Sequence, residues 1–361
     1  MHLLQLKLNN LRALSSFSLQ CSKRMNIICG KNGAGKTSVL EGIYALSCGH
    51  SFRTRQTRHL LQKNKEAFSV FAELKSFDGS SYRLGLEKTS RSTSIHLNGE
   101  KQSSIKSLAE LLPCMVVNSD SFDLLVGDPS NRRERIDWGL FHVEQSFLEI
   151  WRSYHQAIKQ RNKVLQSKDL TTITQWNHMV ASLGEKLSLL HKVYVNKFCT
   201  KLSTLARRWF QVEQLELRYE QGWPEEETLL EALEKGTYRD VSRGFTQTGP
   251  HRADIKVIVD GMPAKALFSR GQLKRFVFLM YVAQGEILFE ESGEWPLFLI
   301  DDLSAELDDD NQALILQILS ELPSQVFLTS IDKGTWNLWQ KHINPEVDNL
   351  FTVKELLLET A

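Results

Sequence analysis

The sequence predicts an α/β protein in which a strand-rich mixed lobe and a parallel-sheet core are separated by an inserted helical arm. Three patterns predict this. Apolar residues recur with a period of two over most of residues 1–117, as in half-buried strands. The period changes to 3.6 over residues 137–209, as on the buried faces of packed helices. Beyond residue 257 short apolar strands alternate with helical segments, which is typical of a parallel sheet.

The first lobe is expected to contain several hairpins and one different unit. Asp78-Gly79 and Asn98-Gly99 separate alternating runs, and these dipeptides are strong hairpin signals. The different unit begins with a compact apolar run at residues 25–29. A glycine-rich stretch at 30–35 and helical spacing over 38–46 follow it. A strand, a glycine loop and a helix are therefore predicted in that order.

The change of period sets the expected domain organisation. The apolar stripes of residues 137–209 are interpreted as the buried faces of packed helices. We therefore expect a helical arm at residues 126–239, inserted into a discontinuous head made of residues 1–125 and 240–361.

Composition excludes several classes of protein. The chain has 361 residues, and 44 Lys and Arg against 43 Asp and Glu give a formal charge of +1. A globally basic nucleic-acid-binding tail is thereby excluded, so any polyanion has to bind a local patch. The apolar runs fall far short of the roughly 20 residues that a membrane span needs, and no signal peptide is expected. The five widely spaced cysteines form no CxxC pair, which favours a reducing, cytoplasmic location.

A phosphate-binding loop is the most specific motif. The residues GKNGAGKT fit the pattern G-x-x-x-x-G-K-[ST] between the predicted strand and helix. Glycines allow backbone N–H groups to point at phosphate oxygens, and the following helix adds its positive N-terminal end. Lys36 is expected to reach the β- and γ-phosphates of ATP, and Thr37 to ligate Mg²⁺. The predicted ATP-binding residues are Gly30, Lys31, Asn32, Gly33, Ala34, Gly35, Lys36 and Thr37.

Two carboxylates complete the predicted site. Asp301 and Asp302 follow the apolar strand 297–300, at the edge of the sheet where ligands of parallel sheets bind. Asp301 is expected to hold Mg²⁺ through water. Asp302 is the candidate catalytic residue that orients or deprotonates the attacking water.

A third motif opens a later helix. Ser269, Arg270, Gly271 and Gln272 form a donor-rich turn just before the helical run 273–287. Together, the phosphate loop, the insertion, this turn and the Asp pair resemble the ABC-type P-loop ATPases. The segment 304–308 looks like the D-loop of that class, with Ser304 and Asp308 at its ends. The resemblance implies an ATP-dependent homodimer in which the signature turn of one subunit acts in trans on the nucleotide of the other.

Within that class the chain resembles the bacterial RecF family of SMC-like DNA repair ATPases over essentially its whole length. The strand 326–328 leads into Thr329-Ser330-Ile331-Asp332 without the histidine usual in transport subunits, and the arm lacks the sustained heptads of long coiled-coil proteins. The matching segments are 6–12, 30–43, 49–53, 127–137, 248–254, 269–275 and 301–308.

The resemblance implies an ATP-dependent clamp on double-stranded and gapped DNA. With RecO and RecR, such a protein promotes RecA loading on single-stranded gaps, and it supports replication recovery and the SOS response. Slow ATP hydrolysis would serve as a conformational switch. A basic run without acids is a candidate DNA-binding surface or simply a solvated face; it comprises Arg53, Arg55, Arg58, Lys63 and Lys65.

Two other functions stay open. A soluble ATPase subunit of a transporter would associate stably with a membrane subunit and would not bind DNA. A nucleotide-binding scaffold would depend on partner recruitment and not on turnover.

Overall fold

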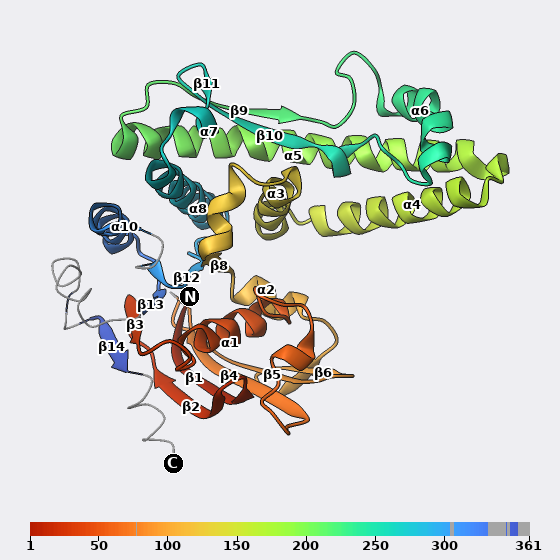
Figure 1. The fold of residues 1–361 in the computed structure, drawn as a ribbon. Coiled ribbons are helices and arrows are strands. Elements are labelled where there is room, and N and C mark those ends of the chain that lie inside the picture. The colour runs from red at the N-terminus through yellow and green to blue at the C-terminus, as the bar shows by residue number, and fades with distance from the viewer. Residues whose placement is uncertain (77, 304–306, 331–343, 345–346, 353–361) are drawn as a thin grey trace. The chain divides into compact units, whose positions relative to one another are not determined.

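The computed structural model describes residues 1–76, 78–303, 307–330, 344 and 347–352. The chain forms two compact units (Figure 1). The first comprises Met1–Phe122 and Gly293–Ala361, and the second comprises Asp123–Ser292. The predicted α/β class with strand-rich lobe, parallel sheet and helical insertion is confirmed.

An antiparallel sheet forms the strand-rich lobe of the first unit. Its order is β2-β1-β4-β5-β6-β7. The strands are β1 (His2–Leu11), β2 (Leu14–Gln20), β4 (Ala67–Lys75), β5 (Ser81–Thr89), β6 (Thr93–Leu97) and β7 (Glu100–Gln102). Both predicted hairpins are present, since β4 pairs with β5 and β6 with β7. In the second turn Asn98 and Gly99 have φ of 52° and 87°, the left-handed conformation that favours this dipeptide.

A five-stranded parallel sheet forms the other layer of the first unit, in the order β14-β3-β13-β12-β8. Its strands are β3 (Met25–Cys29), β8 (Cys114–Val117), β12 (Leu297–Ile300), β13 (Val326–Ser330) and β14 (Asn349–Thr352). The first, third and fourth of these are completely buried, as continuous apolar strands of a covered parallel sheet should be. The strand before the glycine loop and the strand before the Asp pair are therefore separated only by β13.

Helix α1 (Lys36–Cys48) is packed between the two sheets, because it contacts β1, β4 and β5 of one and β8 and β13 of the other. A Cβ atom at Gly42 would lie 2.5 Å from Leu8 Cδ2, so any side chain there would force Leu8 to move. The phosphate-loop helix is thus fixed on both sides. The remaining described helices of this unit are α2 (Lys106–Leu111), α10 (Asp309–Glu321) and the 3-10 turn η1 (Thr57–His59); η2 (Ser119–Leu124) ends in the second unit.

The second unit is built around one long helix. Helix α5 (Ile173–Phe210) has 38 residues and spans about 57 Å. Helices α4, α6 and α8 and strand β9 pack along it (Figure 1). The elements are α3 (Pro129–Val143), α4 (Phe147–Ser167), η3 (Leu170–Thr172), α6 (Leu229–Arg243), η4 (Pro250–Arg252), α7 (Ala264–Leu267), α8 (Arg270–Ser292), β9 (Leu215–Glu220), β10 (Asp254–Val259) and β11 (Met262–Pro263).

The second unit extends further along the chain than the expected arm. The sequence predicts that the head resumes at residue 240, whereas residues 240–292 cluster with the helices. Strand β10 pairs with β9 and not with a head strand, and α8 packs against α5. The small sheet β11-β10-β9 therefore belongs to the helical unit.

A buried arginine in the second unit is paired with a buried acid. Arg161 is completely buried and forms an ion pair with Asp240 at 2.7 Å, while its guanidinium also donates to Asn177 Oδ1 and Thr246 Oγ1. Unpaired, a charge at this depth would cost several kcal/mol. Among the described helices, none combines the length and apolar character needed to cross a bilayer.

Candidate functional site

The glycine loop has the backbone that a phosphate cradle requires. Gly33 and Gly35 have φ of 80° and 99°, which side-chain-bearing residues rarely adopt. A Cβ atom at Gly35 would also lie 2.8 Å from Leu14 Cδ2. The loop thus turns tightly from β3 into the N-terminus of α1, where unpaired backbone N–H groups favour an anion.

Lys36 lies across this loop. Its Nζ donates hydrogen bonds to the carbonyl oxygens of Gly30 at 2.6 Å and Lys31 at 3.2 Å. The side chain is therefore folded back over the loop backbone with its ammonium group at the cradle. A cation at this point complements the charge of a bound polyphosphate.

Asp301 and Thr37 meet across the edge of the parallel sheet. The Thr37 hydroxyl lies 2.9 Å from Asp301 Oδ1 and 3.1 Å from Oδ2. Thr329, the penultimate residue of the intervening strand β13, donates its hydroxyl proton to Asp301 Oδ1 at 2.8 Å. A hydroxyl and a carboxylate side by side are hard oxygen donors of the kind that Mg²⁺ prefers.

Thr329 also positions Asp302, because its hydroxyl oxygen accepts a hydrogen bond from the Asp302 backbone N–H at 2.8 Å. Asp302 has a φ of 51°, a left-handed conformation that costs energy for a non-glycine residue. One threonine side chain therefore holds both members of the Asp pair. Sequence reasoning missed this role; its signal is a polar residue at the carboxyl end of the strand between the two functional strands.

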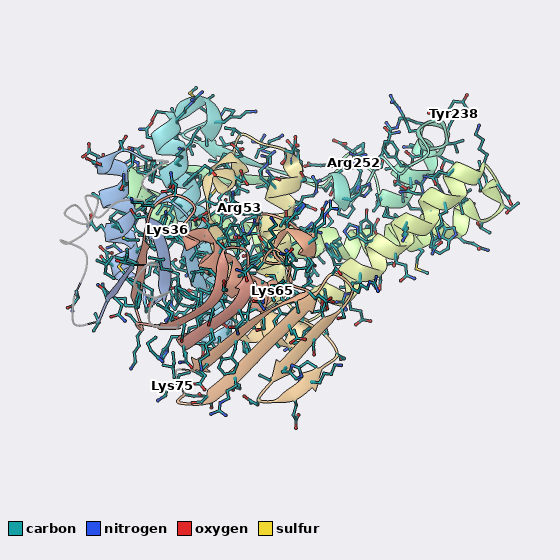
Figure 2. All side chains as sticks on the ribbon, turned by 60° about the horizontal axis from the view of Figure 1, so that its bottom comes forward. Lys36, Arg53, Lys65, Lys75, Tyr238 and Arg252 are labelled. Carbon is teal, nitrogen blue, oxygen red and sulfur yellow. The ribbon has the colours of Figure 1, made fainter. Side chains whose placement is uncertain are left out.

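These groups line one cavity of about 280 Å³. Its lining combines cations with the two acids of the Asp pair, and comprises Arg12, Ala13, Asn32, Gly33, Ala34, Gly35, Lys36, Thr37, Ser38, Arg53, Asp301, Asp302 and Thr329. Figure 2 shows Lys36 and Arg53 in this part of the first unit, and Lys75 at the far end of its sheet. Cations beside hard oxygen ligands suit a nucleoside triphosphate with a divalent metal ion.

Arg12 is a second residue that sequence reasoning did not assign to the site. Its guanidinium pairs with Glu41, a completely buried carboxylate on α1, at 2.5 and 2.6 Å. The Ser51 hydroxyl donates to the same carboxylate at 2.5 Å and accepts from the Arg53 N–H at 2.9 Å. Glu41 thus links the cavity's two arginine-bearing segments to the phosphate-loop helix. A lone acid among apolar residues of a helix was the available signal.

The predicted basic run is exposed along its length. Arg55, Arg58, Lys63 and Lys65 lie on the surface around η1, and Lys65 is labelled in Figure 2. Arg53 differs from them because it lines the cavity. The structure thus places one of the five residues at the candidate nucleotide site.

The predicted signature turn forms the N-terminus of α8. Ser269 N donates to Gln272 Oε1 at 2.9 Å, and Ser269 Oγ accepts from Gln272 N at 3.3 Å, so the two residues cap the helix reciprocally. Ser269, Arg270 and Gln272 are exposed. Phe268 anchors the turn, with ring centroids 5.5 Å from Phe210 and 5.1 Å from Phe276. This surface of the second unit therefore presents a rigid helix N-terminus.

The other predicted residues have structural surroundings. Asp308 caps α10, since its carboxylate accepts from the backbone and side-chain nitrogens of Asn311 at 2.9 and 2.6 Å. Ser304 lies outside the described residues. In the second unit, Arg132 pairs with Asp254 at 2.7 Å and joins two of the segments that resemble the RecF family, 127–137 and 248–254.

Comparisons with known proteins agree with this geometry. The RecF/RecN/SMC N-terminal domain family matches residues 2–348. The DNA replication and repair protein RecF of Marinomonas sp. is 38% identical over 338 residues, covering 93% of this chain and 92% of that protein. RecF of Coxiella burnetii is 36% identical over 352 residues and covers 97% and 96%.

Solved structures give the same fold. A structure of the recombination mediator protein RecF with ATP, from the RecFOR pathway, is 26% identical with a TM-score of 0.82, covering 92% of each chain. A structure of RecF described as RecF-ATPrS has a TM-score of 0.85 at 24% identity, over 97% of this chain and 95% of that one. An SMC head bound to the C-terminal winged-helix domain of ScpA shares the fold, with a TM-score of 0.58 at 14% identity, over 98% and 94%.

Proposed function

The chain belongs to the RecF family, and from that premise we propose that it is an ATP-dependent DNA-binding clamp of gap repair and replication recovery. The observation that carries the proposal is the arrangement at the phosphate loop, in which Asp301 contacts Thr37 and the Thr329 hydroxyl is hydrogen-bonded to both Asp301 and Asp302. A DNA repair role follows from the family, and the ATP-driven clamp is the mechanism that this site supports.

The nucleotide site would work through the residues of the cavity. Lys36 and the N–H groups at the start of α1 would hold the β- and γ-phosphates, and Thr37 and Asp301 would hold Mg²⁺. Bound there, the metal neutralises phosphate charge. Asp302 would orient or deprotonate the attacking water. Hydrolysis by this arrangement would be slow and would reset a switch.

Dimerisation would complete the site. The turn at Ser269 opens helix α8 and is exposed, so it would present the positive N-terminal end of that helix to the γ-phosphate held by a second copy. Two nucleotides bound in this way would favour the closed dimer over free subunits, which is what a ligand-driven switch requires.

Duplex and gapped DNA are the proposed partners, contacted through Arg55, Arg58, Lys63 and Lys65 with phosphate-directed, salt-sensitive binding. Arg53 would instead approach the nucleotide, because it lines the cavity. The RecFOR pathway named for the structural relatives favours RecR and RecO as protein partners, with RecA loading and SOS induction downstream and the cytoplasm as location.

Light scattering of the full chain, with and without ATP, Mg²⁺ and gapped DNA, tests the proposal. We expect monomers to become dimers with ATP, and the dimer to bind DNA. A chain that stays monomeric at saturating ATP and Mg²⁺ contradicts the clamp. ATP-driven dimers that do not bind DNA but bind a membrane subunit would favour the transporter alternative. Recruitment of partner proteins that is unaffected by hydrolysis-blocking variants would favour the scaffold.

A further inference from the structure

A loop on the second unit brings arginines and exposed aromatic rings together. It joins α6 to η4 and comprises residues 244–249. Tyr238, on the outward face of α6, is 89% exposed, and Phe245, in the loop, is 39% exposed. Figure 2 shows Tyr238 projecting from its helix into solvent. The Tyr238 ring is therefore almost wholly available to a ligand, and part of the Phe245 ring is as well.

The cations around this loop are held in place by the loop itself. Arg239 donates to Thr248 Oγ1 at 3.2 Å, and the Arg252 guanidinium lies 5.4 Å from the centroid of the Phe245 ring. Arg243 is exposed in the last turn of α6. We call Tyr238, Arg239, Arg243, Phe245 and Arg252 the arm patch.

The charge of the arm patch is not balanced by acids. Residues 235–253 contain four cations, and their one acid, Asp240, is buried against Arg161. Lys235 pairs with Glu227. Among the described residues, no carboxylate forms an ion pair with Arg239, Arg243 or Arg252. Two exposed acids of α6, Glu231 and Glu234, lie in its N-terminal half; Glu234 is one turn before Tyr238, and neither acid belongs to the loop.

Helix α4 extends the basic surface. Asn162 accepts a hydrogen bond from Thr246 N, and Gln166 donates to the Gly244 carbonyl, so this stripe of α4 adjoins the loop. Lys159 lies on the same stripe, one turn before Asn162, and is exposed. The patch therefore joins phosphate-seeking cations to aromatic faces, the combination by which proteins bind single-stranded nucleic acid without sequence preference.

We propose that the arm patch binds the single-stranded part of gapped DNA, with Tyr238 stacking on an unpaired base and the arginines contacting the phosphates. The proposal rests on the proposed DNA-clamp function and adds the feature that distinguishes a gap from intact duplex. Base stacking on a tyrosine tolerates every sequence, as a gap sensor must. Duplex phosphates would be contacted elsewhere, in the first unit.

The test compares a blunt duplex with the same duplex carrying an oligo-dT tail, by fluorescence anisotropy of the full chain with ATP and Mg²⁺. Tyr238→Ala should lower affinity for the tailed duplex about tenfold and leave the blunt duplex unchanged. Tyr238→Phe, which keeps the ring, should bind both as wild type does. A 2-aminopurine in the tail should change its fluorescence on binding wild type and not on binding Tyr238→Ala.

The arginines give an independent readout. Arg239→Glu and Arg252→Glu should each reduce the slope of log affinity against log salt for the tailed duplex by about 0.7. Arg218→Glu is the matched control, an exposed arginine on β9 that is already paired with Glu216. It should leave the slope unchanged.

The outcomes separate the two proposals. A wild-type chain that binds neither DNA in the presence of ATP overturns the proposed function, and this proposal with it. Duplex binding that persists, with a tail preference insensitive to Tyr238→Ala and to both arginine variants, overturns the arm-patch proposal alone.

Discussion

The Thr37 hydroxyl lies 2.9 Å from Asp301 Oδ1, although the two residues are 264 positions apart in the chain. The contact exists because β3, β13 and β12 are adjacent and parallel, so the residues that follow them meet at one edge of the sheet. Thr37 lies in the first turn of the helix after the first of these strands, and Asp301 directly follows the last. The proposed metal site is therefore a product of strand order.

Asp301→Asn should weaken binding of ATP in the presence of Mg²⁺ by at least about tenfold, because an amide is a poorer ligand for a hard cation than a carboxylate. Titration with a fluorescent ATP analogue, in Mg²⁺ and then in EDTA, measures this. In EDTA the variant and wild type should bind alike. Asp169→Asn is the matched control, since Asp169 caps η3 in the second unit and asparagine caps a helix as well as aspartate does. An equal loss in both variants would contradict the metal assignment.

Asp302→Asn should slow ATP hydrolysis about 100-fold or more and preserve ATP-driven dimerisation. Asparagine tolerates the left-handed backbone at this position, so the loop geometry should persist. Phosphate release and light scattering on the same samples measure the two properties. Undiminished hydrolysis would remove Asp302 from its catalytic role, and a monomeric variant at saturating ATP and Mg²⁺ would exclude the sandwiched dimer.

Mixing two inactive variants tests action in trans. Lys36→Met removes the cation of the phosphate loop and keeps the turn at Ser269. Ser269→Arg disrupts that turn and keeps the phosphate loop. Each alone should lack ATP-driven dimerisation and turnover. A mixed dimer would contain one intact composite site, so the mixture should regain part of the hydrolysis of wild type. A mixture as inactive as its components would argue against complementation between subunits.

The phosphate loop was predictable because its chemistry is local. Eight consecutive residues specify the glycine turn, the lysine and the helix start. The role of Thr329 was not predictable, because it depends on β13 lying between the two functional strands. No local sequence pattern specifies the order of strands in a sheet.

The second boundary of the arm differs between the sequence prediction and the structure for a related reason. Strand 254–259 alternates like any half-buried strand, so its periodicity does not reveal that its partner is β9 of the arm and not a strand of the head. Partner choice depends on packing between residues distant in sequence.

Arg161→Met should destabilise the second unit by about 3–5 kcal/mol, because Asp240 would remain buried without its partner. Urea unfolding followed by circular dichroism measures the loss. Arg161→Met combined with Asp240→Leu should cost less than the sum of the single changes. Arg218→Met, which breaks the exposed pair with Glu216, is the matched control and should change stability by less than about 1 kcal/mol. Equal effects at both arginines would refute the importance of burial.

Acid should weaken the second unit through His251. Its Nε2 lies 3.1 Å from the Thr246 carbonyl and therefore carries the proton, while Nδ1 accepts from the Tyr154 hydroxyl at 2.7 Å. Burial, with nearby Arg252 as a smaller cause, lowers the pKa of His251 to about 4. Both contacts thus suit the neutral ring.

The pKa of this histidine is about 6.5 in the unfolded chain, so the unfolded state takes up the proton first as the pH falls. Stability from His251 is complete above pH 6.5 and is lost toward pH 4, with roughly 2 kcal/mol lost between pH 6.5 and 5. His251→Gln keeps one donor and one acceptor but does not titrate, so its urea midpoint should fall less over this range. Burial lowers the pKa of His142 to about 3, so protonation of this histidine also destabilises the protein as the pH falls. His142 is still present in His251→Gln, so the urea midpoint of the variant should keep some dependence on pH. Parallel pH profiles for wild type and His251→Gln would show that His251 is not buried in its neutral form.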